Sequence, residues 1–235
     1  MNLYEIFQQH PVITTDSRDC PDNSIFFALR GETFDGNQYA VKALQSGCAY
    51  AVVDDENIYT DAGEKDRLIL VPDVLKALQA LANEHRKTLG TTIIGVTGTN
   101  GKTTTKELIS TVLKQKYNVW FTQGNFNNHI GVPKTLLRLT PEHEMAVVEM
   151  GANHPGEIEF LCNISEPDFG IITNVGKAHI EGLRHAVDLQ VVLMTVYGGG
   201  DLFYESTGFC DSVELTCFNL LSSKLLIFCQ FCHSD

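Results

Sequence analysis

The sequence predicts an α/β fold, in which a small N-terminal α/β substrate domain precedes an incomplete P-loop domain built on a parallel sheet. Two observations predict it. Short apolar runs alternate with amphipathic stretches up to about residue 183, and a glycine-rich loop joins a β-branched run to a helical one. Strands that alternate with helices pair in parallel through right-handed crossovers.

Residues 1–86 have the pattern of a small domain. Short apolar runs bounded by turn residues predict strands at 25–29, 49–53 and 68–71. A helix over 38–46 fits between the first two strands, and Gly47 suits the position after its end. Asp73 can cap the next helix, whose apolar residues share one face: Val74, Leu75, Leu78, Leu81 and Ala82.

Residues 87–183 continue the alternation as a second domain. Strands are expected at 92–97, 118–121, 145–150 and 169–173. The helix expected over 102–116 has an apolar stripe made of Leu108, Ile109, Val112 and Leu113. This rhythm predicts a parallel sheet whose ligand edge lies at the carboxyl ends of its strands.

Residues 184–235 break the pattern and form an atypical tail of uncertain fold. All seven Pro lie at or before Pro167, whereas four of the seven Cys lie after residue 183. The apolar segment 215–232 is divided by Lys224, so neither half is long enough for stable membrane insertion. Its Cys229 and Cys232 have only irregularly spaced neighbours, so we interpret the pair as chance rather than as a zinc site.

Composition excludes several classes of function. The 235 residues are 43% hydrophobic and 20% charged, which is typical of a packed protein of one large or two small domains. The net charge of −12 argues against a nucleic-acid partner, because neutralising phosphates needs a basic surface. A local cationic pocket for a small phosphorylated ligand remains compatible with that charge.

The cysteine content and the N-terminus predict a cytoplasmic protein. The first 19 residues lack a basic segment followed by an apolar run, so no secretory signal is expected. Seven Cys is an odd number, and the first three are far apart, which favours free thiols in a reducing compartment. The oligomeric state is not predicted by these features.

The strongest functional signal is a loop that follows a predicted strand and opens a predicted helix. Backbone N–H groups of such a loop, together with the helix N-terminus, bind phosphate oxygens. Lys102 can reach the β- and γ-phosphates, and the Thr103 hydroxyl can bind Mg²⁺. The residues expected to bind the nucleotide are Gly98, Thr99, Asn100, Gly101, Lys102, Thr103 and Thr104. The strict Walker pattern places Gly where this chain has Val96, so the loop is a variant.

Two further segments follow predicted strands. Glu149 ends an apolar strand at the ligand edge of the sheet, where a carboxylate can hold Mg²⁺ beside phosphate oxygens. A solvent-facing Glu is the alternative, and the neighbouring loop favours the metal. His179 follows the last predicted strand and either binds a second metal or is an ordinary loop residue; its chemistry alone leaves both open.

Together these segments resemble the Mur ligases of peptidoglycan synthesis. The loop 97–104 is similar to the family's nucleotide loop, 147–158 to its acidic metal-binding segment and 173–182 to its histidine segment. Residues 15–36 resemble the UDP-sugar-binding domain shared by two of these ligases, and 123–133 resemble the ligase that acts last. The resemblance covers residues 1 to about 183.

The resemblance implies an ATP-dependent amide ligase that joins D-alanyl-D-alanine to UDP-MurNAc-tripeptide through an acyl phosphate. ATP and Mg²⁺ are the implied cofactors, with Lys102 and His179 as catalytic residues and Thr103, Glu149 and His179 as metal ligands. Ser17, Arg18 and Asn128 are the implied substrate contacts, since an Arg can make paired contacts to phosphate. The third residue of the peptide substrate is not predicted.

The chain departs from the family near Leu183. The family's carbamylated lysine has no counterpart, because residues 189–197 contain no Lys. The rest of the central domain and the C-terminal domain are also missing from the resemblance. We expect a frame change or mis-spliced gene fragment there, with impaired catalysis; a divergent subdomain is the alternative.

Other functions remain open. A non-catalytic nucleotide or UDP-sugar binder is the rival from another class. A folate-polyglutamate ligase shares the loop, but residues 15–18 and 26–32 argue against it. A ligase of the preceding step in the same series also remains, whereas a P-loop kinase or GTPase is disfavoured by Val96 and by the lack of a guanine-reading motif.

Overall fold

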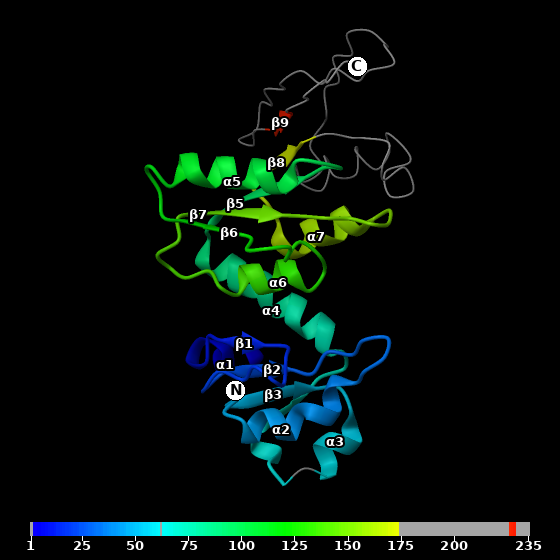
Figure 1. Ribbon diagram of the computed structural model, residues 1–235. Coiled ribbons are helices and arrows are strands. Elements are labelled where there is room, and N and C mark those ends of the chain that lie inside the picture. Colours follow the sequence, from blue (N-terminus) through cyan, green and yellow to red (C-terminus); the bar gives the residue numbers. More distant parts are fainter. Residues whose placement is uncertain (1, 62, 174–225, 229–235) are drawn as a thin grey trace. The chain divides into compact units, whose positions relative to one another are not determined.

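The computed structural model describes residues 2–61, 63–173 and 226–228 (Figure 1). The chain divides into two compact units, Met1–Thr88 with Leu136–Arg138 and Leu89–Thr135 with Leu139–Asp235. Each unit is α/β with a wholly parallel sheet, which confirms the predicted fold class. The functional domain boundaries at residues 86 and 183 stay a prediction.

The first unit is built on a four-stranded sheet of order β1-β2-β3-β4. Its strands are β1 (Ile13–Thr14), β2 (Ile25–Phe27), β3 (Tyr50–Val53) and β4 (Leu68–Leu70). Its helical segments are α1 (Leu3–Gln9), η1 (Gly36–Tyr39), α2 (Ala40–Gln45), α3 (Glu56–Asp61), η2 (Lys65–Arg67) and α4 (Val74–Leu89). The predicted helix 38–46 is therefore a 3₁₀ turn followed by a short α-helix, and α1 and α3 went unpredicted.

Both faces of this sheet are buried, as a parallel sheet requires. Phe26 and Ala51 face a core shared with α2 and with Ile58 and Tyr59 of α3. Phe27 follows Phe26 in β2, so its side chain points to the opposite face of the sheet, and it is fully buried as well. In α4 four of the five residues of the predicted stripe are buried, namely Val74, Leu78, Leu81 and Ala82, whereas Leu75 is half-buried.

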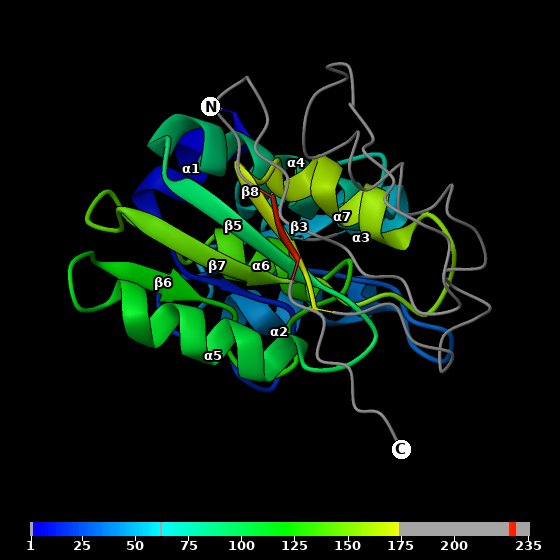
Figure 2. The ribbon, with the colours of Figure 1, turned by 90° about the horizontal axis from the view of Figure 1, so that it is seen from above.

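The second unit is built on a five-stranded sheet of order β6-β7-β5-β8-β9. Its strands are β5 (Thr92–Thr97), β6 (Val119–Phe121), β7 (Met145–Glu149), β8 (Phe169–Ile172) and β9 (Leu226–Phe228). Its helices are α5 (Lys102–Leu113), α6 (Gly131–Leu136) and α7 (Glu157–Ser165). Figures 1 and 2 show α5 and α7 on opposite faces of the sheet, with β5 between β7 and β8.

The predicted apolar stripe of α5 is half wrong. Ile109 and Leu113 pack against the sheet core, but Leu108 and Val112 are 64% and 70% exposed. The buried positions one turn apart are instead Lys106 and Ser110. The buried side of α5 therefore combines this polar pair with Ile109 and Leu113.

Most of the predicted tail, residues 184–235, lies outside the described residues. The exception is β9, which pairs in parallel with β8 through Leu226 and Gly170. The cysteine pair at 229 and 232 also lies outside them. Within the described part of the chain, no helix combines the length and apolar character needed to cross a bilayer.

Asp73 caps α4, as predicted, and this contact makes stability depend on pH. Its Oδ1 accepts a hydrogen bond from the Lys76 N–H at 2.9 Å, and that bond lowers the pKa of Asp73. Asp73→Ala should reduce the free energy of unfolding by about 1 kcal/mol at pH 7. Because the folded pKa is the lower one, this contribution is complete above the unfolded pKa of about 3.9 and is lost as pH falls from there through the folded pKa.

Urea unfolding of both proteins at pH 7 and pH 3 measures the difference. The difference in the free energy of unfolding between wild type and Asp73→Ala should be smaller at pH 3 than at pH 7. Asp66→Ala, at an exposed position, is the control and should differ from wild type at neither pH. A gap that is constant with pH would contradict the role of the ionised cap.

Two of the free thiols in the described part of the chain should be unreactive. Burial raises the pKa of Cys20 to about 11 and that of Cys162 to about 12. Since the thiolate is the reactive form, iodoacetamide at pH 8 should label both more than roughly tenfold more slowly than an unperturbed cysteine. Peptide-resolved mass spectrometry with and without denaturant measures the rates. Labelling in the folded protein at the denatured rate would contradict the burial argument.

Candidate functional site

The glycine-rich loop is a tight turn between β5 and α5. Gly98 and Gly101 have φ of +132° and +77°, values that favour glycine over other residues. Gly95, the other glycine of the variant pattern, lies within β5 and pairs with Val148 and Gly170, so it is part of the sheet rather than of the loop. The loop proper therefore runs over the four residues 98–101.

The first turn of α5 presents its backbone N–H groups without a side-chain cap. Gly101 is the N-cap residue and has no side chain to offer, whereas Asn2 and Asp73 cap α1 and α4. The first N–H groups of a helix have no partner inside the helix, and they carry the positive end of its dipole. The start of α5 thus has the uncapped N–H groups that the predicted anion-binding site requires.

The Lys102 ammonium group lies over this loop. Its Nζ donates to the carbonyl oxygens of Gly98 at 2.7 Å and Thr99 at 3.2 Å. The side chain therefore curls back along the turn, and Thr99 beside it is only 5% exposed. The role of Lys102 in binding phosphate stays a prediction.

Glu149 lies directly beside this loop. It ends β7, and its register partner on the neighbouring β5 is Val96. Its Oε1 accepts hydrogen bonds from Thr103 Oγ1 at 3.3 Å and from Asn127 Nδ2 at 3.0 Å. The side chain is 2% exposed, so the alternative of a solvent-facing glutamate is wrong.

A buried cation accompanies this buried carboxylate. Lys106, one turn after Lys102, is 1% exposed, and its Nζ lies 3.7 Å from Glu149 Oε2. The same Nζ donates to the Thr122 carbonyl at 2.8 Å, and the Thr122 hydroxyl accepts from the Glu149 backbone N–H at 3.0 Å. Lys106 thus offsets the charge of the Glu149 carboxylate, and Thr122 holds the backbone N–H of Glu149.

Thr173 joins the end of β8 to the glycine-rich loop. It is 7% exposed, and its hydroxyl lies 2.5 Å from the Asn100 carbonyl and 3.2 Å from the Thr97 carbonyl. Three adjacent strand ends, those of β5, β7 and β8, therefore meet at one edge. This is the edge at which parallel sheets bind ligands.

The oxygen atoms of Glu149 and Thr103 fit a divalent cation. Glu149 Oε2 is buried and has no hydrogen-bond partner, which is unusual for a carboxylate oxygen and leaves it available as a ligand. Carboxylate and hydroxyl oxygens are the hard ligands that Mg²⁺ prefers. Within the described ranges, no group of three or more His, Cys, Asp or Glu side chains forms a protein-only metal site. His179, the other predicted ligand, lies outside these ranges.

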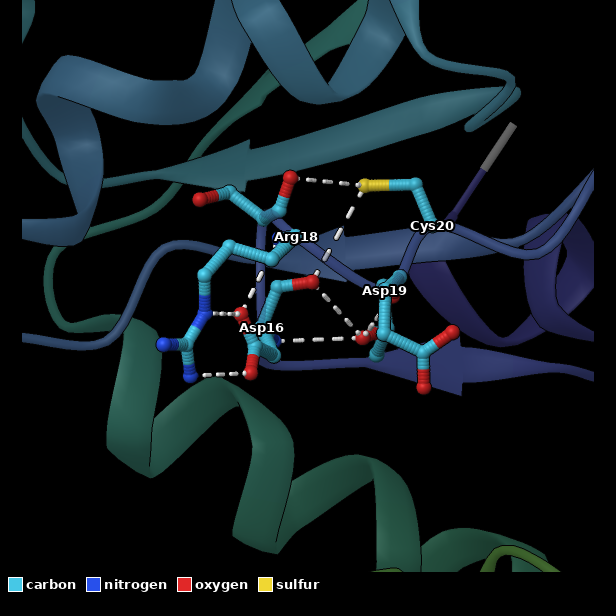
Figure 3. Close-up of polar contacts among 6 residues, drawn as sticks. Asp16, Arg18, Asp19 and Cys20 are labelled. Atoms are coloured by element: carbon cyan, nitrogen blue, oxygen red, sulfur yellow. Dashed lines mark hydrogen bonds and ion pairs between the residues drawn. The ribbon is translucent and has the colours of Figure 1, made fainter.

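The predicted substrate residues Ser17 and Arg18 lie in the loop after β1, and Figure 3 shows the contacts of Arg18 there. The Arg18 guanidinium makes two contacts with the Asp16 carboxylate, at 2.9 and 2.7 Å, which raise the pKa of Arg18. The turn itself is fixed by the Thr14 hydroxyl, which donates to the Asp19 carbonyl at 2.8 Å. The Arg18 side chain is 85% exposed, so its guanidinium group lies at the surface.

Asn128 has a structural task that its pattern did not predict. Its Oδ1 accepts hydrogen bonds from the backbone N–H groups of Ile130 and Gly131, at 3.1 and 2.9 Å, and thereby caps α6. The neighbouring Asn127, which was not singled out, contacts Glu149 instead. The structure therefore brings Lys102, Thr103 and Glu149 together, and it leaves Asn128 as a capping residue.

Lys106, Asn127 and Thr173 are the residues that sequence reasoning missed. Lys106 carried a usable signal, because it lies four residues after Lys102 and therefore on the same helix face. Asn127 and Thr173 had no such signal, since only the paired strands bring them to the loop.

Comparison with known proteins agrees with this geometry. Residues 96–189 match the Mur ligase middle domain, and residues 11–86 match the Mur ligase family catalytic domain. The first match contains the glycine-rich loop and Glu149, and the second contains Ser17 and Arg18.

Two curated relatives carry the same name. The chain is 45% identical over 187 residues to the UDP-N-acetylmuramoyl-tripeptide–D-alanyl-D-alanine ligase of Bacillus subtilis, over 80% of this chain and 40% of the relative. It is 50% identical over 168 residues to the ligase of the same name from Synechocystis, over 72% of this chain and 37% of the relative. The chain thus spans about 40% of the length of these relatives.

Solved structures give the same result. MurF from Acinetobacter baumannii matches with a TM-score of 0.71 and 31% identity, over 83% of this chain and 45% of that one. MurF from Thermotoga maritima, solved in complex with ADP, matches with a TM-score of 0.69 and 32% identity, over 83% and 44%. With two family domains in the expected order and the loop geometry in place, the chain belongs to the Mur ligase family.

Proposed function

We propose that this chain carries the ATP-binding and UDP-sugar-binding parts of a cytoplasmic ligase that joins D-alanyl-D-alanine to UDP-MurNAc-tripeptide. The observation that carries the proposal is the juxtaposition of the uncapped α5 N-terminus, Lys102 and buried Glu149 at one sheet edge. The names of the relatives at 45% and 50% identity support the substrate pair.

The reaction class explains why such a site is needed. Phosphorylating a carboxylate brings two anions together, so cationic groups must offset their repulsion. Lys102 and the backbone N–H groups of residues 98–103 would bind the β- and γ-phosphates, and Gly101 allows the loop to approach them closely. The Glu149 carboxylate and the Thr103 hydroxyl would hold Mg²⁺, which supplies further positive charge at the transferred phosphate.

The remaining predicted residues keep their roles as part of the proposal. His179 would act on a second Mg²⁺, and Ser17 and Arg18 would contact the uridine diphosphate. Arg18 presents a guanidinium that now pairs with Asp16, and a diphosphate could take over that pairing in the same planar geometry. Asn128 would act on the substrate through the backbone that it caps.

Residues 1–86 would form the UDP-sugar domain and 87–183 the partial ATP-binding domain, followed by the tail at 184–235. A non-catalytic nucleotide or UDP-sugar binder is the competing function. Release of ADP in the presence of UDP-MurNAc-tripeptide and D-alanyl-D-alanine separates the two. Turnover supports the ligase, whereas nucleotide affinity without turnover supports the binder.

Lys102→Ala should weaken nucleotide binding strongly. Loss of a charge-assisted contact to phosphate costs about 1.5–3 kcal/mol, or roughly 10- to 150-fold in Kd. Calorimetric titration with ADP and Mg²⁺ measures the change. The exposed Lys114→Ala, at the other end of the same helix, is the control and should bind normally. Equal affinity of Lys102→Ala and wild type would refute the proposed site.

Two glycine substitutions separate backbone strain from phosphate binding. Gly101→Ala and Gly90→Ala both place a side chain at positive φ, +77° and +66°, without a close neighbour. Each should reduce stability by about 1–2 kcal/mol. Only Gly101→Ala should also weaken ADP binding, because Gly90 follows α4 and is not part of the loop. Equal loss of ADP affinity in both variants would show that strain alone is responsible.

A further inference from the structure

Lys106 is a buried charge that the proposed nucleotide chemistry does not use. It is 1% exposed, and its Nζ lies 2.8 Å from the Thr122 carbonyl, 3.2 Å from Glu107 Oε1 and 3.7 Å from Glu149 Oε2. The ring of Phe121 lies 5.6 Å away. Lysine is rarely this buried unless it is paired, so its position requires an explanation.

The two oxygens of Glu149 have different surroundings. Oε1 accepts from Thr103 and Asn127, whereas Oε2 is buried without a hydrogen bond. The 3.7 Å separation from Lys106 is too long for a hydrogen bond, yet short enough for a strong electrostatic interaction at low exposure. An isolated carboxylate at this depth would be costly, and Lys106 supplies the compensating charge.

We propose that Lys106 is a positioning residue for the metal site. It offsets the buried charge of Glu149 and, being anchored on the Thr122 carbonyl, keeps Oε2 at the strand end without consuming it in a hydrogen bond. Oε2 therefore stays available to the divalent cation that accompanies the nucleotide. This inference rests on the proposed function, because it concerns the same site.

A purely structural role is the competing explanation. In that case Lys106 only ties α5 to the segment after β6 through Thr122. Loss of Lys106 would then affect all nucleotide binding equally, by way of the fold. A third possibility is that the ammonium group opposes a bound cation, in which case its removal would strengthen metal-dependent binding.

The ratio of two dissociation constants distinguishes these cases. ADP is titrated calorimetrically into the whole chain with MgCl₂ and again with EDTA, and the ratio of Kd values gives the metal enhancement. In Lys106→Met this enhancement should fall by about 10- to 100-fold, as for other residues that support a metal ligand, while the affinity in EDTA is retained. Mn²⁺ in place of Mg²⁺, followed by electron paramagnetic resonance, reports the bound metal directly.

Two variants serve as matched controls. Lys114→Met removes a cation from the same helix, which also lies over Phe121, and Glu107→Gln removes the exposed partner of Lys106. Both should keep the wild-type enhancement. Lys106→Met with an unchanged or larger enhancement would overturn the inference. If wild type itself binds no ADP in either buffer, the proposed function fails instead.

Loss of the fold in Lys106→Met is also informative. The double variant Lys106→Met/Glu149→Gln removes both charges together, so it should be more stable to urea than Lys106→Met alone if compensation of Glu149 is the reason for Lys106. A double variant no more stable than the single one would assign Lys106 to the Thr122 contact only and would overturn the inference.

Discussion

The burial of one carboxylate at the end of a central strand organises the second unit of this protein. Glu149 is 2% exposed, and four groups converge on it. The Thr103 hydroxyl and the Lys106 ammonium come from α5, the Asn127 amide comes from the segment before α6, and the Thr122 hydroxyl after β6 accepts from the Glu149 backbone N–H. A carboxylate at that depth is tolerated only with such compensation. The site is therefore assembled around a charge rather than around an apolar core.

Parallel pairing places this charge beside the phosphate loop. The register sets Val96 opposite Glu149, so the strand that ends in the carboxylate is the neighbour of the strand that opens into the loop. On the other side, Thr173 at the end of β8 holds the Asn100 carbonyl. Three consecutive strand ends thus fix the loop from both sides, and the order of the sheet becomes part of the site.

The polar face of α5 follows from the same constraint. A helix that covers a sheet is expected to turn apolar residues inward. Here Lys106 and Ser110 are buried while Leu108 and Val112 are exposed. The cost of burying an ammonium group is offset by its contacts with Thr122 and Glu149. The membership of the Mur ligase family is consistent with a site that must gather several anions.

The sequence by itself determined the α/β class, the positions of most strands and the glycine-rich loop between β5 and α5, because these depend on local periodicity and on a short contiguous motif. It also placed Glu149 at a strand end, where the apolar run stops. It could not assign Asn127, Thr122 or Thr173 to the site, since their roles arise from segments brought together by strand pairing. It did not predict that Asn128 caps α6, and the substrate contact implied for that residue stays a prediction. The burial of Lys106 was likewise decided only by the tertiary structure, because its partners, the Thr122 carbonyl and the Glu149 carboxylate, come from other segments.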